Sequence, residues 1–474
     1  MRFFLISLVI LSTVTSYANE IYKFSVDKDL HVEGTYSAEI NKGASFHLVL
    51  MKVKFEDRYK MLPVYITKTG EVREFDLIAL DVLPNIISHH SVNDNISLVS
   101  YNDKEKSLSV FEFDIKSKSF KKNKQEEVEK PDTVFRLDNA TVLLTVDKKG
   151  EKLGYWRIVS WDNQKLEHID IPEELNKEFK KINAVAINQN EFVEKGSFPG
   201  TKAYLNNNEL VYIIDDEKSN TSKSIIIDLN NPSDFLQKEF KTVGTNLEKV
   251  KDYNSYLYNN KVFTVASNKE DMEVTIHNLK EGRQEKRLSL RQDIFKDNQE
   301  MEKFREYLDY TAKGKIKAML TINETSEGNM AVRIDQADNT SYNYNYNWWW
   351  HHEWMLQQNM MMQMQMQQNM RQMMQNLPSG FGPNPSTYEY GYNPNKKSNE
   401  PKPIVFVLNN NLDLINNASG ETVYPEIERE KYLKEYEDDR NMRNVSASFT
   451  QLEIRCVYQD RKSKEIIIDT KLLN

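Results

Sequence analysis

Short apolar runs closed by Asn, Asp, Lys or Gly recur along the chain, whereas helical periodicity is scarce. Runs of this kind, rich in Val, Ile, Leu, Phe and Tyr, are typical of β-strands. They come in consecutive pairs joined by a polar turn. The clearest pairs are residues 96–102 with 107–114, 142–147 with 155–162, 210–215 with 224–228, and 262–267 with 272–277. The pattern therefore predicts an all-β protein.

The paired runs repeat at a nearly regular interval. A weaker pair joins residues 46–53 to 62–67, and a last one joins 446–458 to 465–469. The units start near residues 46, 96, 142, 210, 262 and 318, and four strands with their turns need about 40 to 50 residues. In this respect the chain resembles β-propeller repeat proteins, although it lacks the Gly-His, Trp-Asp and double-glycine marks of particular propeller classes.

The resemblance implies a β-propeller of six or seven blades over residues 19–474. If the last strands pair with the first, the ring closes and leaves no open sheet edge. Two β-sandwich domains are the alternative, but recurrence of one unit favours a ring. Short helices are expected to decorate the blades at Pro172–Lys181, Ser233–Phe240 and Pro425–Arg443.

The first eighteen residues have the three parts of a secretory signal peptide: Arg2, the apolar run Phe3–Val14, and the small residues Ser16 and Ala18. Cleavage would fall between Ala18 and Asn19. A membrane anchor is the alternative, but the run is short for a span that needs about 20 apolar residues. The sequence thus predicts export to the periplasm or the extracellular space.

Charge and cysteine content narrow the possible functions. The chain carries 63 basic and 71 acidic residues in a mixed arrangement, with a net charge of −8. Because nucleic-acid binding favours a basic face, we expect no nucleic-acid partner. Cys456 is the single cysteine, so no intramolecular disulfide can form. It lies in an apolar run, where a half-buried, inert thiol is expected.

Residues 340–402 differ from the rest of the chain and are predicted to form a low-complexity insertion within one blade. Aromatic residues come first and are the candidate contact surface for a protein, peptide, glycan or membrane surface. These are Tyr342, Tyr344, Tyr346, Trp348, Trp349, Trp350 and Trp354. Nine of the 17 methionines of the chain follow, interleaved with Gln, before a strand pattern resumes at Ile404.

The Met/Gln tract contains no Pro or Gly, so a helix is the first expectation. On a helix, several methionines would share one face with two histidines at its margins, and thioethers with an imidazole suit Cu(I). The candidate metal ligands are His351, His352, Met355, Met362, Met366, Met370 and Met373. An adaptable apolar contact and a tract that packs on its own propeller are the two alternatives.

No complete catalytic motif occurs. The nucleophile elbow, the zinc-protease helix and the phosphate loop are all absent, and His89 and His90 beside Asp94 fit a solvated loop pair. We therefore predict an exported, non-catalytic binding or scaffold protein. Copper handling through the insertion is one alternative. A carbohydrate- or peptide-cleaving propeller enzyme is another, since paired carboxylates are recognised only in space.

Overall fold

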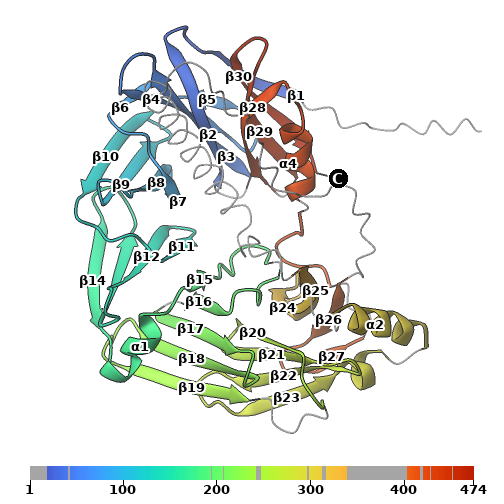
Figure 1. Cartoon of the computed structure of the whole chain (residues 1–474). Coiled ribbons are helices and arrows are strands. Elements are labelled where there is room, and N and C mark those ends of the chain that lie inside the picture. The colour runs from blue at the N-terminus through green and yellow to red at the C-terminus, as the bar shows by residue number, and fades with distance from the viewer. Residues whose placement is uncertain are drawn as a thin grey trace, which may run out of the picture. The chain divides into compact units, whose positions relative to one another are not determined.

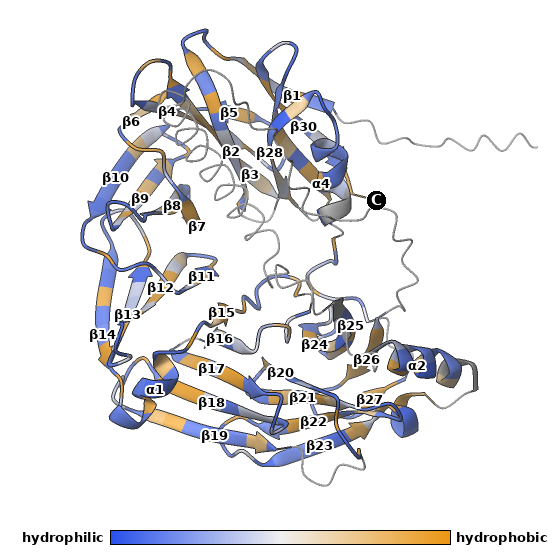
Figure 2. Ribbon diagram, viewed as in Figure 1, coloured by the Kyte–Doolittle hydropathy of each residue, from blue (hydrophilic) through white to orange (hydrophobic). Residues whose placement is uncertain are grey.

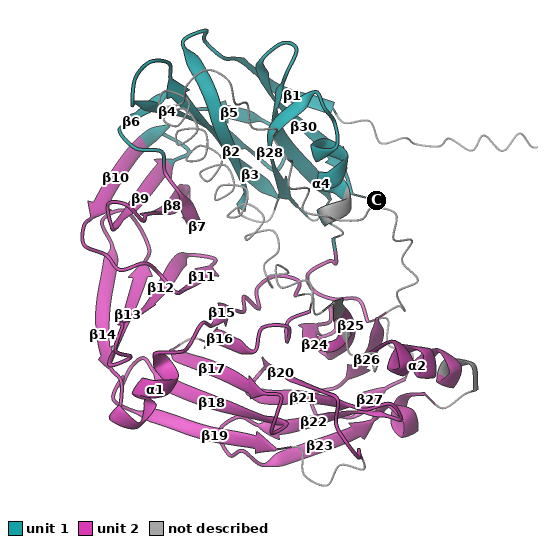
Figure 3. Ribbon diagram, in the orientation of Figure 1, with its two compact units in different colours: residues 1–83, 114–119, 427–474 teal, residues 84–113, 120–426 magenta. Residues whose placement is uncertain are grey.

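The structure, a computed structural model, describes residues 19–40, 43–193, 195–206, 208–241, 247–295, 298–311, 316–338, 403–416, 420–427, 429–450 and 452–473. It divides into two compact units (Figure 3). The first comprises Met1–Leu83, Asp114–Ser119 and Ile427–Asn474, and the second comprises Pro84–Phe113 and Phe120–Glu426.

The first unit contains two antiparallel sheets, which we name the β28 sheet and the β2 sheet after one edge strand of each. The β28 sheet has the order β1 (Asn19–Ser25), β30 (Glu465–Leu472), β29 (Glu453–Asp460), β28 (Met442–Phe449). The β2 sheet has the order β2 (Leu30–Ile40), β3 (Ala44–Val53), β4 (Tyr59–Ile66), β5 (Val72–Glu74), and β6 (Ile78–Leu80) also pairs with β4. Strand β1 runs antiparallel to β30, with Asn19 opposite Thr470. The predicted pairing of first and last strands is thus confirmed.

The second unit contains five sheets, each an antiparallel run of consecutive strands (Figure 1). The β7 sheet holds β7 (Ile86–Val92), β8 (Asn95–Asn102), β9 (Ser107–Asp114) and β10 (Ser119–Gln125). The β11 sheet holds β11 (Thr133–Leu137), β12 (Ala140–Val146), β13 (Lys152–Ile158) and β14 (Gln164–Asp170). The β16 sheet holds β16 (Thr201–Asn206), β17 (Glu209–Asp216), β18 (Thr221–Asp228) and β19 (Phe235–Lys241), and β15 (Val185–Ala186) joins β16 in parallel.

The last two sheets repeat this order. The β20 sheet holds β20 (Asp252–Tyr258), β21 (Lys261–Ser267), β22 (Met272–Asn278) and β23 (Gln284–Ser289). The β24 sheet holds β24 (Ile316–Glu324), β25 (Met330–Asp338), β26 (Ile404–Leu408) and β27 (Leu414–Ile415). Strands β25 and β26 flank residues 340–402 and pair with each other, with Ile334 opposite Ile404.

The middle strands of the β11, β16 and β20 sheets are apolar on both faces because each of these sheets packs between two others. In β17, Leu210 and Tyr212 join an apolar cluster with the β11 sheet, whereas Val211 and Ile213 join one with the β20 and β24 sheets. Successive side chains of a strand point to opposite faces, so burial of both faces requires an unbroken apolar run. Figure 2 shows this as long apolar stretches on strands such as β17 and β21. The fourth strands β10, β14 and β19 are mostly exposed.

The helices agree less well with the sequence-based predictions than the strands do. A helix lies within Pro172–Lys181, as predicted, formed by η1 (Glu173–Leu175) and α1 (Asn176–Phe179). The prediction for Ser233–Phe240 is wrong, because residues 235–241 pair with β18 as strand β19. Among the described residues of Pro425–Arg443, only α4 (Arg429–Glu437) is helical.

The helix α2 (Asn298–Thr311) was not predicted. Its side chains Phe304, Tyr307 and Leu308 are buried in the cluster shared with the β20 and β24 sheets. Three apolar residues at this spacing form one helical face. Charged residues lie around these three, so the sequence pattern does not reveal the apolar helical face.

Candidate binding site

A segment without regular secondary structure, residues 187–200, links the first strands of several sheets in the second unit; we name it the crossing segment. The Ile187 amide donates to the Ala203 carbonyl of β16 at 2.8 Å, and Gln189 Nε2 donates to the Leu257 carbonyl of β20 at 2.6 Å. Ser197 N then donates to the Leu320 carbonyl of β24 at 3.0 Å. The first strands of three sheets therefore converge on one stretch of chain.

Hydrogen bonds and close packing fix the crossing segment on β24. Asn323 binds Val193 twice: its Oδ1 accepts from the Val193 amide at 3.0 Å, and its Nδ2 donates to the Val193 carbonyl at 2.9 Å. The Gly196 amide donates to Thr321 Oγ1 at 2.7 Å. A Cβ atom added to Gly196 would lie 2.4 Å from the ring of Tyr256, so only glycine fits this approach.

The crossing segment places Phe192 at a cavity of about 480 Å³, which we name the Phe192 pocket. Phe192, Ala331, Val405 and Pro425 give it apolar walls. Its remaining lining residues are Asn323, Arg333, Gly420, Glu421, Thr422 and Glu426. Val405 is 48% exposed. The volume suits one or two amino-acid side chains of a ligand.

Arg333 is held rigidly on one wall of the pocket. Its Nη1 and Nη2 atoms lie 2.7 and 2.8 Å from the two carboxylate oxygens of Glu426, and its Nε lies 2.8 Å from Asp335. Burial alone would lower the pKa of Arg333, but Glu426 and Asp335 raise it above its ordinary value. The guanidinium carbon is 5.8 Å from the centre of the Phe192 ring. This fork-to-fork geometry makes a fixed cation with a set orientation.

A second polar group lies beside Phe192 in the sequence. Arg136 on β11 has Nη1 at 3.1 Å from His89 Nε2 and Nη2 at 3.7 Å from Glu191. His89 and its neighbour His90 are only 5% and 2% exposed, so the expected solvated loop pair is wrong. Both lie in β7, whose pairing with β8 buries them. Asn190 Nδ2 donates to Asp138 Oδ1 at 3.1 Å.

The pKa of Tyr424 is affected by carboxylates near this group. Burial raises the pKa of Tyr424, and the charges of Asp138, Glu324 and Glu191 raise it further. Three carboxylates from β24, the crossing segment and the end of β11 thus act on one hydroxyl. Tyr424 belongs to the same segment as Thr422 and Pro425, which line the Phe192 pocket.

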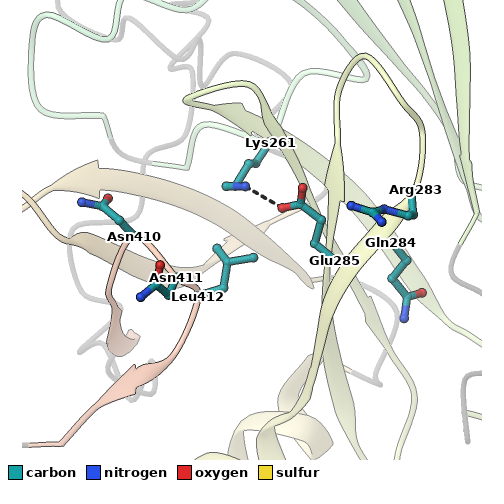
Figure 4. Close-up of a pocket in the computed structure, with 7 residues that line it drawn as sticks. All are labelled: Lys261, Arg283, Gln284, Glu285, Asn410, Asn411 and Leu412. Atoms are coloured by element: carbon teal, nitrogen blue, oxygen red, sulfur yellow. Dashed lines mark hydrogen bonds and ion pairs between the residues drawn. The ribbon is translucent and has the colours of Figure 1, made fainter.

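A shallower polar pocket of about 450 Å³ lies between the β20 and β24 sheets (Figure 4). Lys261 and Glu285 form an ion pair across it at 2.5 Å, and the Lys261 hydrogen bond lowers the pKa of Glu285. Its other lining residues are Arg283, Gln284, Asn410, Asn411 and Leu412. It lacks an aromatic or aliphatic wall apart from Leu412, so it offers little apolar area to a ligand.

A Ser–His contact in the first unit resembles part of a nucleophilic dyad but cannot act as one. His47 Nδ1 lies 2.8 Å from Ser37 Oγ, and His47 Nε2 lies 2.8 Å from Ser45 Oγ. All three side chains are fully buried. Burial, and then the charge of Arg455, lowers the pKa of His47 to about 3, so the ring accepts no proton near neutral pH. The group is an internal hydrogen-bond network.

Asp252, at the start of β20, is a titratable group whose burial makes the stability of the second unit depend on pH. Its Oδ2 accepts from the Ala318 amide at 2.5 Å, and its Oδ1 has no hydrogen-bond partner among the described residues. Burial raises the pKa of Asp252 from 3.8 to about 6. The folded state then binds this proton more tightly than the unfolded state, so the contribution to stability is present at low pH and is lost as pH rises through 6.

We therefore expect Asp252→Asn to gain stability relative to the wild type as pH rises from 4 to 7, by up to about 3 kcal/mol. Urea unfolding at both pH values measures the difference. Asp216→Asn is the control: hydrogen bonds from Ser219 and Lys218 lower the pKa of Asp216 below its ordinary value of 3.8, so its stability relative to the wild type should change little between pH 4 and 7. A pH-independent difference for Asp252→Asn would contradict the assignment.

The residues proposed from sequence as contacts or ligands lie outside the described residues. This holds for the whole aromatic set Tyr342 to Trp354 and for the histidines and methionines 351–373. Among the described residues, no group of three His, Cys, Asp or Glu side chains is arranged to hold a metal ion. Within the same residues, no helix is long and apolar enough to cross a membrane. Cys456 is fully buried rather than half-buried, and burial raises the pKa of its thiol, which disfavours the reactive thiolate.

Sequence reasoning did not find the Phe192 pocket. Its lining comes from the crossing segment, β24, β25, β26 and residues 420–426, which are far apart in the sequence. The one local signal is Gly196–Ser197–Phe198–Pro199–Gly200, a turn-forming stretch that interrupts the strand pattern. It marks an irregular segment without indicating where that segment goes.

Comparison with known proteins identifies no family. No family model matches the chain, and no curated protein matches its sequence. A functionally unknown protein from Desulfotomaculum acetoxidans is 13% identical, with 58% of this chain and 72% of that chain covered and a TM-score of 0.25. A neuraminidase-like protein of A/little yellow-shouldered bat/Guatemala is 8% identical, with coverages of 68% and 95% and a TM-score of 0.25. Similarity this low transfers neither a fold nor an activity to this chain.

Proposed function

We propose that this chain is an exported binding protein, built as a seven-bladed β-propeller, that receives a peptide segment of a partner protein in the Phe192 pocket. The observation that carries the proposal is the convergence of three first strands on the crossing segment, which sets an aromatic ring and a fixed guanidinium at one cavity. Ligand sites with apolar walls and a few oriented polar groups fit this description.

The propeller part of the proposal rests on three features of the sheets. Among the described residues each of the seven sheets is built mainly from consecutive strands paired antiparallel, and β1 completes the sheet formed by the last strands. In the second unit, the β7 and β11 sheets, then the β11 and β16 sheets, then the β16, β20 and β24 sheets share apolar clusters. Stacking in chain order, with first strands at a common segment, is what a ring of blades requires.

The polar atoms of the pocket favour binding over acid–base chemistry. Glu426 uses both carboxylate oxygens on Arg333, and Asp335 is buried against the same guanidinium. Asn323 is occupied by the Val193 backbone. These groups are therefore held in place rather than poised to exchange protons, and the walls present shape and charge to a ligand.

A library of random peptides displayed on phage and selected on the immobilised protein tests this function. We expect enriched peptides whose affinity falls at least about tenfold for Phe192→Ala, because aromatic anchors in pockets dominate binding energy. Phe55→Ala is the control: Phe55 is a fully exposed aromatic side chain in the first unit, outside the pocket. Enriched peptides that bind Phe192→Ala as tightly as the wild type would refute the proposal, as would no enrichment.

The aromatic residues of 340–402 are proposed as a further contact surface. Since β25 and β26 pair at Ile334 and Ile404, a short Gly/Ser linker in place of residues 340–402 should join the two strands without changing their register. We expect this deletion to unfold at the same denaturant concentration as the wild type while losing affinity for a natural partner. Loss of the folded state, measured by circular dichroism, would show that the segment belongs to the core.

A further inference from the structure

The shallow polar pocket between the β20 and β24 sheets, which we name the Lys261 pocket, is built from turns of two neighbouring sheets (Figure 4). Residues 283–285 lie where the turn between β22 and β23 passes into β23, and Lys261 begins β21. Residues 410–412 form the turn between β26 and β27, which is the corresponding turn of the next sheet. Two adjacent sheets of the second unit therefore supply the whole lining.

Hydrogen bonds within the protein fix both turns. Asn278 Oδ1 accepts from two amides of its own turn, each at 3.1 Å, and its Nδ2 donates to Glu285 Oε1 at 3.2 Å. Asn409 Oδ1 accepts from two amides of the other turn, each at 2.9 Å. Between the sheets, Lys286 Nζ lies 3.2 Å from Asp413 Oδ1. The lining is thus positioned without a ligand, which reduces the cost of ordering it on binding.

Three side-chain amides of the lining are open to solvent. They belong to Gln284, Asn410 and Asn411, which are exposed and make no side-chain hydrogen bond within the described part of the chain. Each amide group offers two N–H donors and one carbonyl acceptor. The pocket can therefore donate to a ligand and accept from it at several points.

The charges of the Lys261 pocket are balanced. Lys261 and Glu285 pair at 2.5 Å, with side chains 23% and 18% exposed. Arg283, which is 73% exposed, has its Nε atom 3.5 Å from a carboxylate oxygen of Glu281. Each cation of the lining thus lies beside a carboxylate. An anionic ligand would meet Glu285 and a cationic ligand would meet Lys261 and Arg283, so charge complementarity favours a neutral ligand.

The lining also disfavours an apolar ligand. Among its described residues, Leu412 is the one apolar side chain, and it is only 5% exposed. An apolar group would displace water from the polar side chains without replacing the lost hydrogen bonds. A neutral molecule with several hydroxyl groups replaces them, because each hydroxyl both donates and accepts, as the lining does.

We infer that the Lys261 pocket binds a neutral sugar residue of a glycan, whose hydroxyl groups bond to Asn410, Asn411 and the Lys261–Glu285 pair. This site goes beyond the proposed peptide binding, because the Lys261 pocket and the Phe192 pocket share no lining residue. Since the pocket is shallow and mostly polar, a single sugar residue should bind weakly, with a Kd of about 1 mM.

A microarray of neutral and acidic glycans, probed with the full-length protein, tests this inference. We expect binding to neutral glycans that share one terminal sugar. Calorimetric titration with that glycan in solution should give the same affinity, within about twofold, at low and at high salt concentration, because a neutral ligand has no charge to screen.

Variants on the two sides of the pocket assign the site. The double change Asn410→Ala and Asn411→Ala should weaken binding at least about tenfold, and Glu285→Gln, which keeps the shape but removes the charged acceptor, at least about threefold. Asn230→Ala is the matched control, because Asn230 is an exposed asparagine in the turn between β18 and β19. It should bind like the wild type, and so should Phe192→Ala. Thermal unfolding scans show that each variant is folded.

Three results would overturn the inference. The first is the absence of binding to any neutral glycan, and the second is neutral-glycan binding that survives the double alanine change. The third is binding that is restricted to acidic glycans and lost at high salt, which would mean that Lys261 and Arg283 hold an anion. None of these results bears on peptide binding, which is measured separately through Phe192→Ala.

Discussion

Asp215→Ala should lower the free energy of unfolding by about 3 to 5 kcal/mol, among the largest effects expected in this protein. Asp215 and Lys202 form an ion pair at 2.6 Å with side chains only 3% and 0% exposed. Asp215 also accepts from Ser222 Oγ at 2.7 Å and from the amide of Ser255 at 3.1 Å. Removing the carboxylate leaves the Lys202 ammonium buried, with the Pro199 carbonyl, 2.9 Å away, as its remaining partner among the described residues.

Urea unfolding measures this change, and Lys280→Ala is its control. Lys280 pairs with Glu209 at 2.6 Å but is 53% exposed, and exposed pairs contribute little. Asp215→Ala could instead lower the free energy of unfolding no more than Lys280→Ala does. This result would mean that Lys202 reaches water and that the β16 and β20 sheets do not enclose it.

Gly196→Ala should displace the crossing segment and cost about 1 to 3 kcal/mol, the usual range for an added methyl group in a filled core. The added Cβ would meet Tyr256 at 2.4 Å and Val193 at 2.8 Å. Neither can retreat easily, because Tyr256 is fully buried and Val193 is 2% exposed. Since Phe192 precedes Val193, the same change should weaken peptide binding.

Gly200→Ala is the matched control in the same segment. No atom lies within 4 Å of the Cβ position of Gly200, and its φ is not positive. We expect its stability and peptide affinity to match the wild type. Equal stability and equal peptide affinity of the two alanine variants would show that Gly196 is not packed against β20.

The local strand pairs were predictable because they depend on neighbouring residues. The predicted runs 96–102 with 107–114 and 262–267 with 272–277 match β8 with β9 and β21 with β22 almost residue for residue. In each, an apolar run ends at a polar turn, and the turn sets the hairpin. The run 446–458 is the exception: Thr450 and Leu452 form a turn that divides it into β28 and β29.

The site was not predictable for a different physical reason. The contact between Val193 and Asn323 joins residues 130 positions apart, and nothing in either neighbourhood requires it. His89 appeared to be a surface residue because its neighbours are polar, yet sheet pairing buries it. The sequence of Ser233–Phe240 favours a helix because Ser233 can cap a helix start. The segment instead pairs with the neighbouring strand β18.

Hydrogen exchange of the crossing segment tests most directly whether it is a fixed part of the core that holds Phe192 at the pocket. In the wild type, the amides of Val193, Gly196 and Ser197 donate to β24 although the segment has no regular secondary structure. Mass spectrometry of peptides within residues 187–200 should therefore show exchange as slow as in β16. Exchange as fast as in the exposed turn at residues 230–234 would contradict the account.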